Sequence, residues 1–139
     1  MMEMENEFQL FLNLEIPEKD IVITISKYLA IDFASENINT LDPGGFIIST
    51  SYSSGFKQGI LVISYDKITR EKVIELANYL SLSLNVSVLI DPDFFTKDNG
   101  DDYKWTLIAK GESFLVDVSY LNDGVEPVVF RKAKYYKTS

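Results

Sequence analysis

Apolar and polar side chains alternate over residues 8–16, and Phe11 is the single apolar residue that interrupts the polar positions. Because neighbouring side chains of a strand point to opposite faces, a period of two predicts a strand with one buried face. The positions expected to point inward are Phe8, Leu10, Leu12, Leu14 and Ile16.

A helix is expected from residue 17 to about residue 35. Pro17 suits a first helical position, and Glu18 and Asp20 place negative charge near the positive end of a helix. The β-branched run over residues 21–25 favours a strand instead, so both alternatives stay open at this point. In the helical alternative the inward residues are Ile21, Ile25, Tyr28, Leu29 and Phe33.

The middle of the chain predicts a hairpin and a second helix. A turn at residues 42–45 precedes strands at 46–52 and 58–65, and the second strand is apolar on both faces, as in an interior strand covered on both sides. Thr69 is typical of a residue that caps a helix, and helical spacing continues to about residue 80. A strand follows, with its boundary between residues 81 and 86.

Three further strands are expected at residues 103–109, 113–121 and 127–132, because short turn sequences separate them as in a meander. The fold class predicted is α+β, with a largely antiparallel sheet and two helices on one face. Over residues 8–91 the order of elements resembles the ferredoxin-like βαββαβ layout, a resemblance of topology that carries no functional motif.

The 139 residues, 46% of them hydrophobic, suit one globular domain, in which we expect residues 1–6 and 133–139 to be flexible. No stretch reaches the roughly 20 apolar residues of a membrane helix. The acidic start differs from a secretory signal, so we expect a cytoplasmic protein.

The chain has no cysteine and no histidine, which excludes disulfides, thiolate nucleophiles, the usual zinc sites and imidazole bases. Glycine-rich phosphate loops are missing as well. The serines and threonine at residues 49–54 lack a nucleophile elbow, so we interpret them as a polar strand face that runs into a loop.

Two acidic segments have features of metal-binding sites. Asp91 and Asp93 resemble the two-aspartate element with which many glycosyltransferases hold a divalent cation, although aspartate around proline is also ordinary turn chemistry. Residues 98–102 fail the EF-hand spacing, because the first, third and twelfth positions of such a loop fall on residues without a carboxylate. We therefore expect no metal and no cofactor.

Negative charge is concentrated in two stretches of the chain. Residues 1–20 and 91–102 together carry eleven acids and two lysines, whereas the net charge of the whole chain is -8. Residues 131–137 add a short basic tail.

Aromatic residues lie within and directly after the second acidic stretch, residues 91–102. The predicted partner-binding residues are Asp91, Asp93, Phe94, Phe95, Asp98, Asp101, Asp102, Tyr103 and Trp105. A lone tryptophan on a strand is equally typical of a core, so Trp105 has two interpretations.

Carboxylates around aromatic anchors suit the docking of a basic protein, because charge speeds the encounter and the rings supply contact energy. The leading hypothesis is a non-catalytic binding protein, a small acidic inhibitor of the bacterial immunity-protein or antitoxin kind that covers the basic active surface of a toxin such as a nuclease. Neither nucleic acid nor membrane is expected as a partner. The alternatives are a carboxylate-based enzyme, with Asp91 and Asp93 on a divalent metal, and a self-associating structural subunit.

Overall fold

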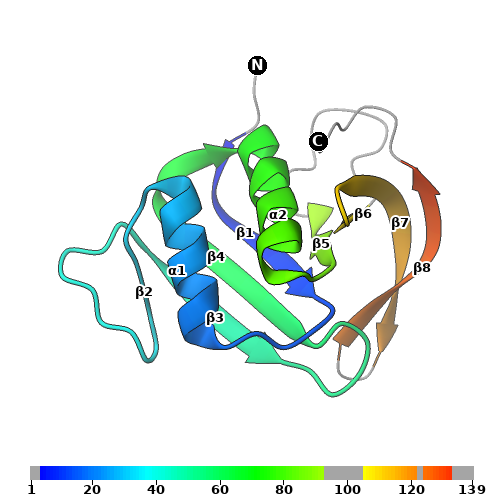
Figure 1. Ribbon diagram of the computed structural model, residues 1–139, viewed down its shortest axis with the longest axis horizontal. Helices are drawn as coiled ribbons and strands as arrows, with labels where there is room; N and C mark the ends of the chain where they lie inside the picture. Colours follow the sequence, from blue (N-terminus) through cyan, green and yellow to red (C-terminus); the bar gives the residue numbers. More distant parts are fainter. Residues whose placement is uncertain (1–3, 93–104, 122–123, 133–139) are drawn as a thin grey trace.

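The chain folds into two helices and one eight-stranded sheet, as the computed structural model shows for residues 4–92, 105–121 and 124–132 (Figure 1). The strands follow the order β2-β3-β4-β1-β5-β6-β7-β8, and every neighbouring pair is antiparallel except β2 with β3. The elements are β1 (Met4–Leu12), α1 (Glu18–Leu29), β2 (Phe33–Ser35), β3 (Gly45–Ser51), β4 (Gln58–Thr69), α2 (Arg70–Leu84), β5 (Val88–Ile90), β6 (Trp105–Ala109), β7 (Glu112–Leu121) and β8 (Gly124–Lys132).

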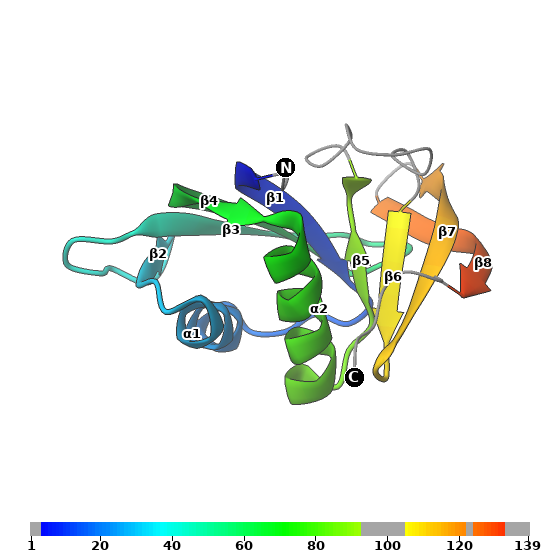
Figure 2. The ribbon, with the colours of Figure 1, turned by 90° about the horizontal axis from the view of Figure 1, so that it is seen from above.

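Both helices lie on the same side of the sheet, and the larger core fills the space between them and β1, β3, β4 and β5 (Figure 2). The alternation along β1 puts Phe8, Leu10 and Leu12 into this core, as the sequence predicts. The inward placement predicted for Leu14 is wrong, because β1 ends at Leu12 and the Leu14 side chain is exposed in the connection to α1.

Residues 21–25 are helical, so the strand alternative for them is wrong. Ile21 and Ile25 are fully buried, and burial of one helix face outweighs the weak strand preference of β-branched residues. The helix is shorter than predicted, since Ala30 adopts a left-handed conformation and its N–H caps the last turn. Phe33 is buried as expected, but it lies in β2, which pairs in parallel with β3.

The second helix begins and ends where the sequence predicts. The side chain of Thr69 accepts a hydrogen bond from the N–H of Lys72 at 3.1 Å, which caps α2, and the helix ends at Leu84, within the expected window.

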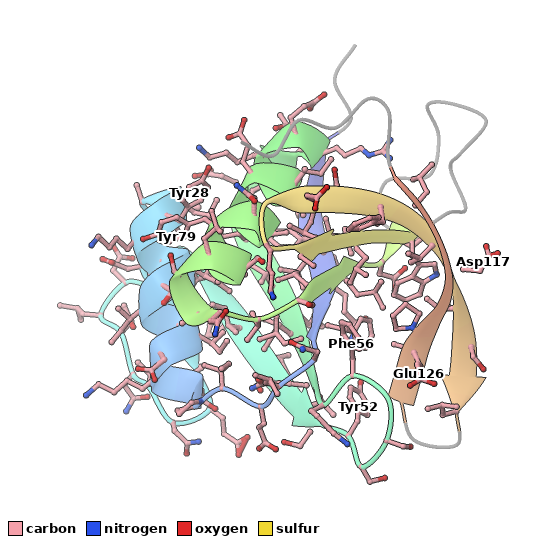
Figure 3. All side chains as sticks on the ribbon, turned by 45° about the vertical axis from the view of Figure 1, so that its right-hand side comes forward. Tyr28, Tyr52, Phe56, Tyr79, Asp117 and Glu126 are labelled. Carbon is pink, nitrogen blue, oxygen red and sulfur yellow. The ribbon has the colours of Figure 1, made fainter. Side chains whose placement is uncertain are left out.

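An aromatic contact joins half-buried residues of the two helices. The rings of Tyr28 and Tyr79 stack with centroids 4.8 Å apart, and the Lys72 ammonium lies 4.8 Å from the Tyr28 ring (Figure 3). The Tyr28 hydroxyl donates to Glu75 at 3.3 Å. Partial burial, followed by the Glu75 charge, raises the pKa of Tyr28, so its hydroxyl remains a donor at neutral pH.

The strands β5 to β8 curl away from the plane of the first strands and enclose a second core (Figure 2). The buried members of this core are Phe11, Leu89, Trp105, Leu107, Val116 and Val125. The loop between β3 and β4 closes it, because the N–H of Phe56 donates to the carbonyl of Val125 at 2.8 Å and Tyr52 packs against the same core (Figure 3).

The predicted α+β class, with two helices and a mostly antiparallel sheet, is confirmed, and so is the meander of β6, β7 and β8. The sheet is larger than predicted, because β2 is an additional strand and the meander extends the same sheet. Among the helices of the described residues, none has the length and apolar character needed to cross a membrane.

Candidate functional site

Two of the predicted partner-binding residues lie in the described part of the chain, and both are buried. Trp105 is 6% exposed, and its ring centroid lies 5.7 Å from that of Phe11 in the second core. Asp91 follows β5 and is also buried, with its N–H donating to the carbonyl of Gln9 at 3.2 Å. The structure therefore favours the core interpretation of Trp105.

The pairing of Ile90 with Thr106 brings Asp91 and Trp105 to the same end of neighbouring strands. The other predicted residues lie outside the described residues, and their role in binding stays a prediction. They are Asp93, Phe94, Phe95, Asp98, Asp101, Asp102 and Tyr103.

On the face of β3 and β4 that points away from the helices (Figure 2), the described part of the chain leaves a group of apolar side chains exposed. Phe46 is 40% exposed, Ile48 is 50% exposed and Tyr65 is 62% exposed. The rings of Phe46 and Tyr65 contact edge to face, with centroids 6.3 Å apart. Half-buried Leu61 and Ile63 complete the surface. These five residues are called the outer patch below.

The strand register explains why these five side chains gather on one face. Across the sheet, Phe46 of β3 lies opposite Ile63 of β4, and Ile63 lies opposite Glu7 of β1. The exposed Glu7 carboxylate is therefore next to the apolar pair Phe46 and Ile63. Ile48 and Leu61 form a second row. The sequence predicts that β4 is covered on both sides, and this is wrong, since both helices lie on the same side.

A polar depression of about 520 Å³ lies on the opposite, helix-facing side of β3. Its lining residues are Glu15, Ile16, Pro17, Glu18, Ser49, Ser51 and Gln58. The buried Gln58 amide forms its floor and is fully engaged. Its Oε1 accepts from the N–H of Ile16 at 2.7 Å, and its Nε2 donates to the carbonyl of Ile16 at 2.9 Å and to the Ser49 hydroxyl at 2.8 Å.

Two carboxylates give this depression a negative charge. Glu15 accepts a hydrogen bond from the Ser51 hydroxyl at 2.9 Å. Glu18 accepts from the Ser35 hydroxyl and from the N–H of Asn37, and the bond from Ser35 is the main cause that lowers the pKa of Glu18. The depression, called the acidic pocket below, is therefore suited to a cationic group.

The acidic pocket does not have the composition of a metal centre. Over the described ranges, no group of three or more acidic side chains is arranged to hold a metal ion. The serines at residues 49 and 51 hold the side chains of the pocket in place, with Ser49 accepting from Gln58 and Ser51 donating to Glu15.

The edge of β3 is open next to the acidic pocket, because β2 pairs only with the first three residues of β3 (Figure 1). At the hairpin end, the N–H of Tyr52 points toward β4 and donates to the carbonyl of Lys57 at 2.8 Å. Backbone groups of successive residues point to opposite sides of a strand, so those of Ser49 and Ser51 point away from β4. Among the described residues, no backbone group pairs with them.

Sequence reasoning missed the outer patch and the acidic pocket. One signal for the patch was present, since residues 60–63 are apolar on both faces and two helices on one side leave the other face uncovered. The pocket had no such signal, because Glu15 and Ser51 come together only through the fold. Comparisons of the chain with known protein families, with curated proteins and with solved structures found no match.

Proposed function

We propose that this chain is a non-catalytic binding protein that docks a basic protein partner. The single observation that carries this proposal is the outer patch, in which large apolar side chains stay exposed on a rigid sheet. Contiguous exposed apolar side chains with a polar rim are typical of interaction sites, because exposure to water has a free-energy cost that a partner removes. Tyr65 belongs to a residue type that dominates binding energy at interfaces, and Phe46 belongs to one that is enriched in interface cores.

Charge supports a basic partner over a neutral one. The net charge is -8, and Glu7 borders the outer patch. Glu15, in the connection after β1, and Glu18, at the start of α1, line the acidic pocket on the other side of the sheet. Complementary charge accelerates association and disfavours acidic competitors. The acidic stretch at residues 91–102 belongs to this proposal on its sequence alone.

Within this class we propose an inhibitor of the bacterial immunity-protein or antitoxin kind, acting in the cytoplasm by covering the basic active surface of a toxin. When the additional strand β2 is left out, the sheet order β3-β4-β1-β5 with two helices on one face supports a ferredoxin-like interpretation of residues 8–91. A fold of that kind hosts many functions, so it carries no part of this argument.

The test is affinity capture from the source cell with three forms of the chain. The wild type and the control Ile23→Ser, which changes an exposed apolar residue of α1, are expected to retain the same basic protein. The double variant Phe46→Ser/Tyr65→Ser is expected to lose it. Equal capture by all three forms would exclude the outer patch as the binding surface.

The inhibitor proposal has its own test with the captured protein. If that protein arrests growth when expressed alone, co-expression of the wild-type chain should restore growth and the double variant should not. A captured partner that is harmless to the cell would leave a binding protein without an inhibitory role.

A further inference from the structure

We propose that an extended segment of the basic partner adds to the sheet at the open edge of β3, with its cationic side chains in the acidic pocket and its alternate apolar side chains beside the outer patch. This inference rests on the proposed function and names the way in which the partner binds. Three observations support it, namely the backbone of β3, its two faces and the negative charge beside its edge.

The backbone of β3 provides the docking edge. Ser49 and Ser51 direct two N–H donors and two carbonyl acceptors outward, beyond the point where β2 ends. An open row of this kind is a template for another strand, and strand addition is a recurring mode of peptide recognition. These backbone hydrogen bonds give affinity that does not depend on the side chains of the added segment.

The two faces of β3 provide specificity. Side chains of an added strand would alternate between the faces, as those of β3 do. Positions beside Ser49 and Ser51 share the helix-facing side with Glu15 and Glu18, whereas positions beside Ile48 share the side of the outer patch. A segment that alternates lysine or arginine with valine or isoleucine therefore fits both faces at once.

The charge beside the edge argues against a second copy of this chain as the occupant. Pairing of two β3 edges would bring Glu15 and Glu18 of one copy toward those of the other, and like charges in close juxtaposition are destabilising. A cationic segment instead gains attraction from the same carboxylates.

The direct test uses a blocked peptide of alternating lysine and valine, titrated into the wild-type chain and followed by amide hydrogen exchange. Exchange at Ser49 and Ser51 is expected to slow by about tenfold when the peptide is about nine-tenths bound. The amide of Thr50 faces β4 and serves as the internal reference. A peptide of the same composition with three lysines followed by three valines lacks the alternation and should protect these amides much less.

A pair of variants isolates the backbone contribution. Ser51→Pro and Ser51→Ala both remove the hydroxyl that donates to Glu15, but only proline removes the outward N–H and places a ring at the edge. Relative to Ser51→Ala, Ser51→Pro is expected to weaken peptide binding by about tenfold or more. The exchange measurement on the wild type decides the question even if Ser51→Pro fails to fold.

A second pair isolates the charge contribution. Glu15→Gln with Glu18→Gln should weaken binding several-fold at low salt, and the loss should shrink as salt is added. Asp66→Asn with Glu71→Gln changes the charge equally at exposed positions outside the pocket and should have a much smaller effect.

The possible outcomes separate this inference from the proposed function. Unchanged exchange at Ser49 and Ser51, or equal binding by Ser51→Pro and Ser51→Ala, would overturn strand addition. If the captured partner still depends on Phe46 and Tyr65 in that case, the proposed function stands without it. A dimer of the chain that Ser51→Pro dissociates would show that a second copy occupies the edge, which would also overturn the inference.

Discussion

At the scale of single residues, Gln58 shows how one buried side chain holds a connection that has no regular structure. Its amide pairs with both backbone groups of Ile16, as a neighbouring strand would, and also binds the hydroxyl of Ser49. The amide thereby fixes the chain between β1 and α1 against β3 and β4. Glu15 and Glu18, which flank this point, are positioned at the pocket as a result.

We expect Gln58→Ala to lower the free energy of unfolding by about 2 to 4 kcal/mol, since it removes three hydrogen bonds and leaves the backbone of Ile16 without its partner. Gln9→Ala, on the outer face of β1, should cost less than about 1 kcal/mol. Chemical denaturation of the two variants checks this. Equal losses would mean that the Gln58 hydrogen bonds add little to stability.

The carboxylate of Glu18 predicts a pH dependence of stability. Its pKa is lowered from 4.5 in the folded chain, so its contribution is present above that value and is lost as the pH falls through the folded pKa. Because the side chain is only half-buried and water screens its charge, we expect Glu18→Gln to cost no more than roughly 1 kcal/mol at pH 7.

Denaturation of the wild type and Glu18→Gln at a series of pH values measures this difference, which should shrink as the pH falls below the ordinary carboxyl pKa and through the lower folded pKa. Glu71→Gln is the matched control, because Glu71 occupies the first turn of α2 as Glu18 occupies the first turn of α1. A difference for Glu18→Gln that is constant with pH would contradict the assigned role of the carboxylate.

At the scale of elements, the second core depends on the contact between the β3–β4 loop and the first two residues of β8. Gly55 has a φ of +69°, and a Cβ at this position would lie 2.3 Å from the carbonyl oxygen of Val125. Gly124 has a φ of +134° and approaches the carbonyl of Ser54 as closely. Both glycines permit a backbone contact that any side chain would prevent.

We expect Gly55→Ala to destabilise the fold by about 2 to 4 kcal/mol, because it combines an unfavourable φ with a clash against backbone. Gly111→Ala carries the same kind of φ, +82°, but meets nothing within 4 Å, so it should cost only about 1 kcal/mol. Thermal unfolding of both variants separates the cost of the steric clash, which only Gly55→Ala has, from the cost of the unfavourable φ, which both variants share. A similar loss of stability in the two variants would show that the β3–β4 loop moves to relieve the clash at little free-energy cost.

At the scale of the whole molecule, the charge and the arrangement of layers act together. Two helices cover one side of the first strands, the curl of β5 to β8 encloses the second core, and the outer patch remains uncovered. The net charge of -8 gives the molecule an overall negative field, and the Glu7 carboxylate lies beside the exposed apolar surface. Long-range attraction and short-range apolar contact therefore favour the same kind of partner.

Neutralising Asp98, Asp101 and Asp102 together is expected to lower the on-rate for a captured basic partner at low salt, with a smaller effect on the off-rate. The effect should fade as salt rises, because the Debye length falls from about 10 Å at 0.1 M to about 3 Å at 1 M. Stopped-flow or surface-binding kinetics measure both rates. Unchanged kinetics at low salt would remove this acidic stretch from the steering of the partner.

The sequence by itself determined most of the elements, because local patterns encode them. Alternation predicted β1, and short turn sequences predicted the meander. Thr69 predicted the start of α2, since a hydroxyl before a helix satisfies a free N–H within three residues. The net charge and the exclusion of cysteine and histidine chemistry also follow from composition alone.

The tertiary structure alone decided where α1 ends, where Trp105 lies and which surface stays bare. Phe33 fits the apolar face of a longer helix, but pairing of its backbone with β3 turns it into a strand residue. Ser51 and Glu15 are 36 residues apart, and Ser49 and Gln58 are on different strands, so no local pattern predicts the pocket that they form. Such a site depends on long-range pairing, in which the free energy of burial and of backbone hydrogen bonds outweighs local preference.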